Sequence, residues 1–208
     1  MTITPHQTEF LERINKKFLE SFQVMNKVSD RKKVTVYGSA RLSETNPIFG
    51  EIKEFSLELR KQGWMMMSGG GPGVMKAALD GDDVAEENET IAFQIDLQKE
   101  QHDSDADIGI KFTDFFVRKY FLRSADVFIV APGGFGTMDE AFEVITLLQT
   151  HKLKYRRVIF YKKEYWAPLL DWFKDTMLKQ GMISADDFEL FQMADTPEEV
   201  VKLVNKPA

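Results

Sequence analysis

Residues 126–150, DVFIVAPGGFGTMDEAFEVITLLQT, decide the fold of this chain. The segment opens with a short apolar run rich in β-branched residues, which is typical of a strand buried on both faces of a parallel sheet. A glycine turn follows, and apolar residues then recur at helical spacing from Met138 to Leu148. The segment therefore predicts a strand, a tight turn and a helix that begins at Gly136 and Thr137, which is the repeating order of an α/β fold.

The predicted turn is a favourable place for a phosphate group. The first turn of a helix has unpaired N–H groups, and the helix dipole favours negative charge beside them. Glycine lets the backbone approach an anion closely. We therefore expect phosphate at the turn formed by Gly133, Gly134, Gly136 and Thr137, with the carboxylate of Glu140 in the same helix.

Another glycine turn, SGGGPG at residues 68–73, lies between the apolar run 64–67 and the helical pattern that starts at Val74. In chain order this is the first glycine turn, and the turn at 133–137 is the second. Neither turn has the spacing of a P-loop, and Val74 stands where the dinucleotide fingerprint needs a third glycine or alanine. A single turn of this kind is explained equally well as a tight connection in an α/β domain. The pair favours one nucleotide-like ligand.

The composition of the chain argues against several classes of partner and of functional site. The chain has 208 residues, of which 43% are hydrophobic, and a net charge of −6. This acidic balance argues against nucleic acid or an anionic membrane as the main partner. The chain has no cysteine, which excludes disulfides and thiolate chemistry, and its three histidines lack metal-site spacing. We expect no metal, no signal or membrane-spanning segment, and a cytoplasmic location.

The periodicity predicts alternating strands and helices after an amphipathic amino-terminal helix at 7–25. Strands are expected at 33–37, 64–67, 90–95, 126–131, 157–161 and 191–194, and helices at 47–62, 73–87, 113–124, 165–180 and after Thr196 and Pro197. This order predicts a Rossmann-like, doubly wound parallel sheet with helices on both faces. We divide the chain into a helical extension, residues 1–30, and a single nucleotide-binding domain, residues 31–208.

Two segments keep two interpretations each, and a third has one. The amino-terminal helix packs on its own domain or contributes to a subunit interface. The basic cluster at 152–157, KLKYRR, is a solvated junction or an anion contact. The polar residues 98–107 form a loop near the carboxyl end of a strand, where ligands of open α/β sheets bind.

The motif FFVRK at 115–119, followed by PGGFGTMDE at 132–140, resembles the LONELY GUY family of nucleotide N-glycosidases, which were long mislabelled as lysine decarboxylases. Similar residues occur at 36–41 (VYGSAR), 69–75, 100–101 and 147–150, so the resemblance covers nearly all of the chain after the first helix. It implies a homodimer or larger assembly that hydrolyses a nucleoside 5′-monophosphate to base and ribose 5-phosphate without a cofactor. It also implies that Arg118 and Glu140 are the catalytic pair.

The residue chemistry agrees with that implication. Cleavage of an N-ribosidic bond builds positive charge on the sugar, which the Glu140 carboxylate can stabilise while Arg118 orients the reacting groups. Glu143, one turn later, can bear on the same site. We assign substrate and phosphate binding to these nine residues: Gly38, Ser39, Gly70, Gly71, Lys119, Gly133, Gly134, Gly136 and Thr137.

The chain departs from the family pattern around the first glycine turn. Similar proteins often carry glutamate where Lys76 stands, asparagine where Asp80 stands, glycines near 87–90 and a proline where Gln98 stands. These changes bear on recognition of the base. We expect the Lys76 side chain to face solvent.

Two other functions remain open. Carriers of the molybdenum cofactor resemble this family in the PGG-x-GT loop, so a non-catalytic binding or carrier protein would use the same turn. A pyridoxal-phosphate decarboxylase would need a buried Schiff-base lysine with an acidic partner for the ring nitrogen. No lysine of the sequence has a recognisable setting for that role.

Overall fold

The computed structural model describes residues 3–81, 90–96, 104 and 106–207. Within them, seven parallel strands form one sheet in the order β4-β3-β2-β1-β5-β6-β7. The strands are β1 (Lys33–Tyr37), β2 (Met65–Ser68), β3 (Thr90–Ile95), β4 (Ile108–Phe112), β5 (Val127–Val130), β6 (Arg157–Tyr161) and β7 (Phe191–Ala194). The expected Rossmann-like α/β fold is confirmed.

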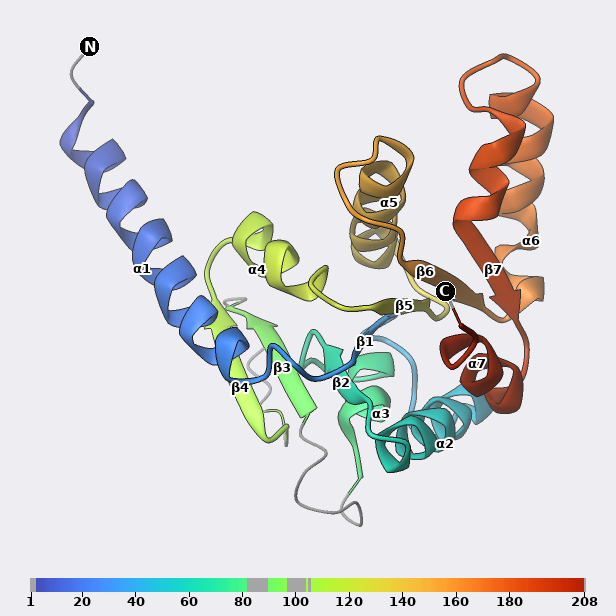
Figure 1. The fold of residues 1–208 in the computed structure, drawn as a ribbon, viewed down its shortest axis with the longest axis horizontal. Helices are drawn as coiled ribbons and strands as arrows, with labels where there is room; N and C mark the ends of the chain where they lie inside the picture. The colour runs from blue at the N-terminus through green and yellow to red at the C-terminus, as the bar shows by residue number, and fades with distance from the viewer. Residues whose placement is uncertain (1–2, 82–89, 97–103, 105, 208) are drawn as a thin grey trace.

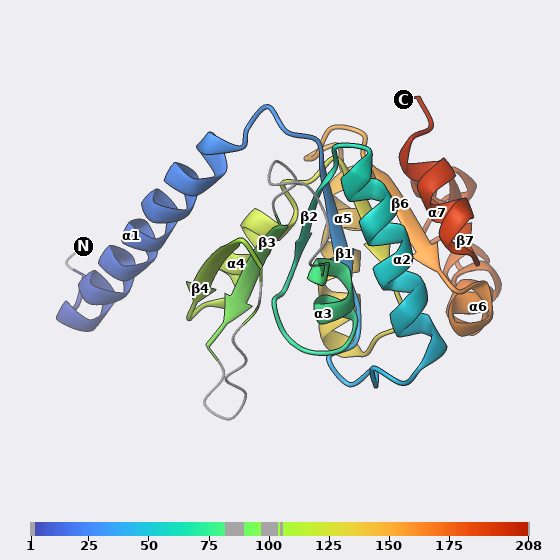
Figure 2. The ribbon, with the colours of Figure 1, turned by 90° about the horizontal axis from the view of Figure 1, so that it is seen from below.

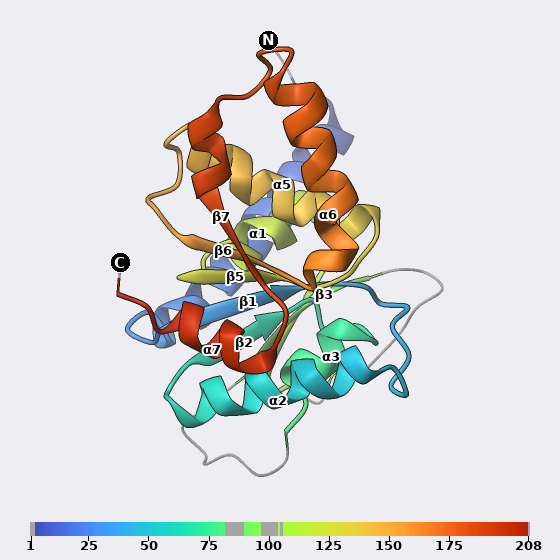
Figure 3. The same ribbon diagram turned by 90° about the vertical axis from the view of Figure 1, so that its right-hand side faces the viewer.

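Helices cover both faces of this sheet (Figures 1 and 3). One face carries α2 (Pro47–Lys61), α3 (Val74–Leu79) and α7 (Pro197–Val204), and the other carries α1 (Pro5–Lys27), α4 (Phe115–Leu122), α5 (Phe135–Gln149) and α6 (Lys163–Trp172). Short helical turns at Phe173–Leu178 and Ala185–Leu190 lie between α6 and β7. Each face has its own apolar core, so the central strands are buried on both sides as their near-continuous apolar sequences predict.

The carboxyl ends of β1 and β5 form the switch point of the sheet. The strand β1 has β2 on one side and β5 on the other, and the chain winds away from it in both directions. The backbone N–H of Ser39 donates to the carbonyl of Pro132 over 3.0 Å, which joins the loops that follow these two strands. Ligands of open α/β sheets bind in the crevice at such a point.

Most predicted elements are confirmed within one or two residues. The strands at 33–37, 90–95, 157–161 and 191–194 have the predicted bounds, and β2 is shifted by one residue. The last helix begins as predicted, with Thr196 as the N-cap that accepts a hydrogen bond from the N–H of Glu199 and with Pro197 in the first turn.

Two predictions of secondary structure are wrong. The strand β4 was not expected, although residues 108–112 (IGIKF) alternate in burial as an edge strand does. The helix predicted at 73–87 ends at Leu79, because Asp80 is extended and Gly81 has a φ of 157°. Residues 82–87 of that prediction, and most of the polar loop at 98–107, lie outside the described residues.

The amino-terminal helix lies beside α4 at one end of the sheet (Figure 2). Phe18 and Phe22 of α1 contact the rings of Tyr120 and Phe121 of α4. The helix therefore packs on its own chain, while several of its apolar side chains stay exposed. None of the described helices has the combination of length and apolar character needed to cross a bilayer.

Candidate active site

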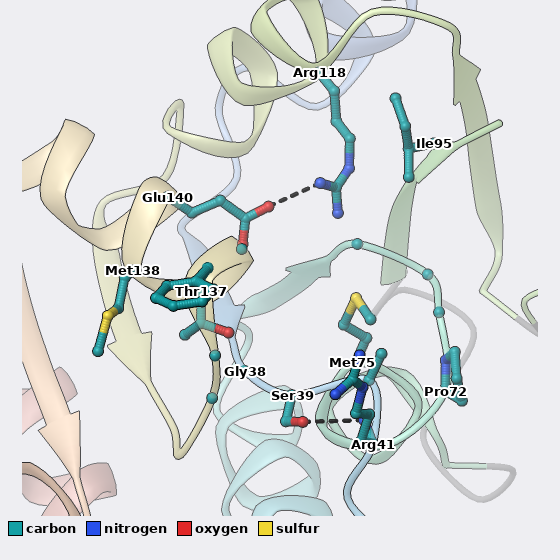
Figure 4. A pocket seen from close by; sticks show the side chains of 18 of the residues that line it. Gly38, Ser39, Arg41, Pro72, Met75, Ile95, Arg118, Thr137, Met138 and Glu140 are labelled. Atoms are coloured by element: carbon teal, nitrogen blue, oxygen red, sulfur yellow. Dashed lines mark hydrogen bonds and ion pairs between the residues drawn. The ribbon is translucent and has the colours of Figure 1, made fainter. Parts of the chain in front are cut away.

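A cavity of about 650 Å³ lies at the switch point of the sheet, between the two glycine turns (Figure 4). Its size is that of a small-molecule site. The loop after β1, the turn after β2, the end of β3, α4 and the turn after β5 all contribute to its walls. The lining residues are 38–41, 69–72, Met75, Gln94, Ile95, Arg118, 133–138, Glu140 and Tyr165.

Arg118 and Glu140 form an ion pair inside this cavity. The Nη1 atom of Arg118 lies 2.8 Å from Oε1 of Glu140, and their side chains are only 8% and 13% exposed. Figure 4 shows both side chains turned toward the cavity from different helices. The Nε atom of Arg118 also donates to the carbonyl of Phe93 in β3 over 2.7 Å, so the guanidinium is fixed by backbone as well as by charge.

The guanidinium also lies against the first glycine turn. A Cβ atom at Gly69 would collide with Nη2 of Arg118, so this position has room for hydrogen alone. At Gly70, φ is +68° and a Cβ would meet Gln94 and Ala92. The two glycines are therefore required by close approach and by a left-handed backbone, respectively. Arg118 thus connects the first glycine turn with the Glu140 carboxylate of α5.

The second glycine turn opens the helix α5 without a side-chain cap. Gly134 is the N-cap residue, and the first helical hydrogen bond runs from the N–H of Met138 to its carbonyl over 3.0 Å. The N–H groups of the first turn consequently have no partner within the helix, which makes this end an anion site. Thr137 packs under Gly133, whose carbonyl accepts a hydrogen bond from the Tyr165 hydroxyl over 2.8 Å.

Burial and charge act in opposite directions on Glu140. Loss of solvent raises the pKa of the Glu140 carboxyl above its ordinary value, and this is the largest effect. The Arg118 guanidinium opposes the increase by stabilising the carboxylate, while Asp139 adds to it. Burial likewise raises the pKa of the Tyr37 hydroxyl, and Glu140 and Glu143 raise it further. The site therefore combines a carboxylate that is costly to ionise with a fixed cation that supports ionisation.

The structure places most of the predicted site residues around this cavity. Gly38, Ser39, Gly70, Gly71, Arg118, Gly133, Gly134, Gly136, Thr137 and Glu140 all line it. Lys119 does not, because its ammonium group lies 2.9 Å from both Asp139 and Glu143. Glu143 is also outside the lining and pairs with Arg123 at 2.8 Å.

Of the positions that depart from the family pattern, those that the structure describes also lie outside the cavity walls. The Lys76 side chain is 44% exposed and pairs with Glu44 at 2.6 Å, so the expected exposure is confirmed. Asp80 pairs with Lys53 at 3.0 Å. Gln98 and residues 87–89 lie outside the described residues.

Sequence reasoning missed several residues of the cavity wall. Arg41, Gln94 and Ile95 follow or end strands whose carboxyl ends meet at the switch point, which was a usable signal. Met75 and Tyr165 come from helices and gave no such signal. No lysine belongs to the described lining, and no group of three or more histidine, aspartate or glutamate side chains suited to a metal ion is found in the part of the chain that the structure describes.

A family model described as "Possible lysine decarboxylase" matches residues 72–204, which include both catalytic candidates. The chain belongs to this family, the LONELY GUY family. The cytokinin riboside 5′-monophosphate phosphoribohydrolases LOG4 and LOG3 of Arabidopsis thaliana are 35% and 34% identical over 80 and 86 residues. The matched parts cover 38% and 41% of this chain and 37% and 40% of those relatives. This LONELY GUY family member therefore matches these relatives over about two-fifths of their length.

Solved structures share the fold at low identity. A molybdenum cofactor binding protein from Rippkaea orientalis superposes with a TM-score of 0.58 at 23% identity, covering 84% of this chain and 95% of that one. A molybdenum cofactor carrier protein from Chlamydomonas reinhardtii has a TM-score of 0.53 at 21% identity, with 85% and 99% covered. These likenesses support the Rossmann-like architecture of the LONELY GUY family member described above.

Proposed function

We propose that this protein hydrolyses the N-glycosidic bond of a nucleoside 5′-monophosphate, of the AMP or cytokinin riboside monophosphate type. The products are the free base and ribose 5-phosphate. The observation that carries the proposal is the buried Arg118–Glu140 ion pair, held in a cavity that two glycine turns enclose. Relatives that are named as phosphoribohydrolases of such monophosphates support it.

In the proposed reaction, the 5′-phosphate binds at the amino end of α5. The unpaired N–H groups of the first turn and the helix dipole favour its charge there, and glycine at 133, 134 and 136 leaves the backbone accessible. A Cβ atom at Gly134 or Gly136 would meet no neighbouring atom, so the approach to this turn is open. Phosphate binding then sets the distance between the ribose and Glu140, one helical turn further on.

The chemical step breaks the bond between C1′ and the base nitrogen. The base leaves with the electron pair and takes up a proton, while the oxygen of a water molecule forms the new bond to C1′ and loses a proton. Glu140 is suited to stabilise the positive charge on the sugar and to accept that proton, a contribution of about 10² to 10⁴ in rate. Arg118 keeps Glu140 ionised and oriented through the 2.8 Å contact.

The test compares wild type with Glu140→Gln and Arg118→Ala, and free base is measured by chromatography. We expect base release from nucleoside monophosphates and none above background from the corresponding nucleosides. Both variants should lose base release by about 10² or more. Asp139→Asn is the matched control, because this carboxylate lies next to Glu140 in sequence but pairs with Lys119 outside the cavity.

Two results would contradict the proposal. One is a folded wild type that binds AMP and releases no more adenine than Glu140→Gln over hours. The other is a loss in Asp139→Asn equal to the loss in Glu140→Gln, which would assign the effect to general charge in α5.

The competing function is a binding or carrier protein for the molybdenum cofactor, supported by the similarity of the PGG-x-GT loop. The phosphate of the pterin would occupy the same turn, and Glu140 would have no chemical role. A fluorescent pterin that co-purifies with wild type and is lost in Thr137→Val would favour this function over hydrolysis.

A further inference from the structure

A second cavity, of about 670 Å³, lies at the amino ends of the central strands. Its walls come from the α1–β1 connection, the start of β5, the connection into β6 and the residues after α7. In Figure 2 the α1–β1 connection and the carboxyl-terminal segment lie at the upper edge, and the β1–α2 connection lies at the lower edge. This cavity and the candidate active site are therefore at opposite edges of the sheet.

The walls of this amino-edge cavity are strongly basic. Six cationic side chains line it, Arg31, Lys32, Lys33, Arg156, Arg157 and Lys206, together with the two carboxylates of Asp30 and Asp126. The whole chain has a net charge of −6, so the excess of cations here opposes the charge of the molecule. A concave site of one sign attracts ions of the other sign from solution.

Two of these cationic side chains are buried. Lys33 and Arg157 are only 5% and 8% exposed. The Lys33 ammonium donates to the carbonyl of Arg31 over 2.6 Å, and Nη1 of Arg157 donates to the carbonyl of Leu203 over 2.7 Å. Backbone carbonyls satisfy hydrogen bonds without cancelling the charge. Buried charges are usually paired, yet no described carboxylate lies within ion-pair distance of either side chain.

Further details indicate an incomplete charge balance. The Nε atom of Arg157 is buried and has no hydrogen-bond partner among the described residues. Burial lowers the pKa of Lys33, and Asp126 offsets only part of this effect. One oxygen of Asp126 accepts from the backbone N–H of Lys33 over 3.0 Å, and the other lies 3.8 Å from Nε of Arg156. The carboxylate of Asp126 is therefore already engaged, and it has no ion pair with Lys33 or Arg157.

We propose that the amino-edge cavity binds an anion of nucleotide size that carries several phosphate groups. The cations come from three segments distant in sequence, 31–33, 156–157 and 206, so a single inorganic phosphate could contact only a few of them. The volume suits a nucleoside polyphosphate. The Tyr155 ring, 57% exposed at the same cavity, offers an apolar face beside the phosphates.

The test uses the indole N–H of Trp64 as a local reporter. Trp64 lines this cavity, its indole donates to the Asn205 side chain over 3.0 Å, and Lys32 lies 5.5 Å from its ring. The chain has three tryptophans, so ¹H–¹⁵N spectra contain three indole signals, which Trp64→Phe assigns. Full-length protein is titrated with tripolyphosphate, ATP and adenosine at constant ionic strength.

We expect tripolyphosphate and ATP to move the Trp64 signal in a saturable way and adenosine to leave it unchanged. The double variant Lys32→Ala/Lys206→Ala should weaken this binding by about tenfold or more, because it removes two charge-assisted contacts. Lys154→Ala is the matched control, since this lysine belongs to the same basic cluster but does not line the cavity.

Three results would overturn the proposal. The first is a Trp64 indole signal that stays unchanged at millimolar tripolyphosphate. The second is an equal shift of that signal when sodium chloride of the same ionic strength replaces tripolyphosphate. The third is an equal loss of binding affinity in Lys154→Ala and in the double variant. These results do not depend on hydrolysis at the other edge, so the two proposals fail independently.

Discussion

Arg118 contacts three parts of the chain that are distant in the sequence. Its guanidinium contacts Glu140 through Nη1, the β3 backbone through Nε and the face of Gly69 through Nη2. Each contact comes from a different part of the sequence. The position of the carboxylate therefore depends on a residue in the first glycine turn, although the two are 71 positions apart by number.

This contact predicts a strong effect of Gly69→Ala. The added methyl group would displace the Arg118 guanidinium, and a shift of about 1 Å at a catalytic group costs roughly 10² in rate. We expect kcat/KM for base release to fall by about that factor, with the fold retained by circular dichroism. Gly50→Ala is the control, because a Cβ there meets no atom within 4 Å and alanine favours the helix. Equal activity in the two variants would contradict the proposed role of Gly69.

The raised pKa of Glu140 predicts the acid limb of the pH profile. Because the reaction needs the carboxylate, kcat/KM should fall as the pH decreases through the pKa of Glu140. Burial raises that pKa, so the fall should begin above the ordinary carboxyl value of 4.5. The measurement is kcat/KM against pH, with tryptophan fluorescence as a check on folding. A profile that stays flat below pH 4.5 in folded protein would contradict it. Asp139→Asn removes a charge that raises the Glu140 pKa, so the limb should move to lower pH in this variant.

At the scale of elements, the packing of helix α4 holds Arg118 in place. Phe121 lies one turn after Arg118 and is 1% exposed, packed against Phe93, Phe112 and the α1 aromatics. The helix has only eight residues and no side-chain cap, so packing rather than intrinsic propensity holds it in place.

We therefore expect Phe121→Ala to lower the free energy of unfolding by about 3–5 kcal/mol, the usual cost of removing a buried phenylalanine. Urea denaturation measures this value. Met182→Ala is the control, since its side chain is 67% exposed and its loss should cost less than 1 kcal/mol. Similar values for the two variants would show that α4 does not pack on the sheet as described.

The elements also show where sequence patterns fail. The strand β4 has only two buried side chains, Ile110 and Phe112, and so carries less apolar signal than a central strand. The helix α3 stops early because the backbone is extended at Asp80, and the apolar spacing of the sequence carries no information about that change. Both errors lie at the edge of the sheet or at the end of an element, where tertiary contacts outweigh local preference.

At the scale of the whole molecule, exposed aromatic side chains predict self-association. Phe10 and Phe22 of α1 and Phe115, Phe116 and Tyr120 of α4 are each between 37% and 53% exposed. A monomer seldom exposes a large aromatic surface, and a twofold dimer is the commonest way to cover one. We predict a homodimer or larger assembly.

Multi-angle light scattering tests this prediction. The wild type should have at least twice the mass of one chain, and Phe115→Ser/Phe116→Ser should shift the mass toward one chain. A wild-type mass equal to one chain would refute the assembly. Lys179→Ser, an exposed residue of the distant turn after α6, should leave the mass unchanged.

The sequence by itself determined the α/β class, the strand-to-helix order, the two glycine turns and the candidate pair Arg118 and Glu140. These features follow from local periodicity, from backbone requirements of glycine and from short motifs, all of which are encoded over a few neighbouring residues. Only the tertiary structure decided that Arg118 contacts Gly69 and Glu140 together, that Lys119 pairs outside the cavity, and that six cations meet at the amino edge. Those facts depend on which strands become neighbours and on which side chains lose solvent, and no local pattern specifies either.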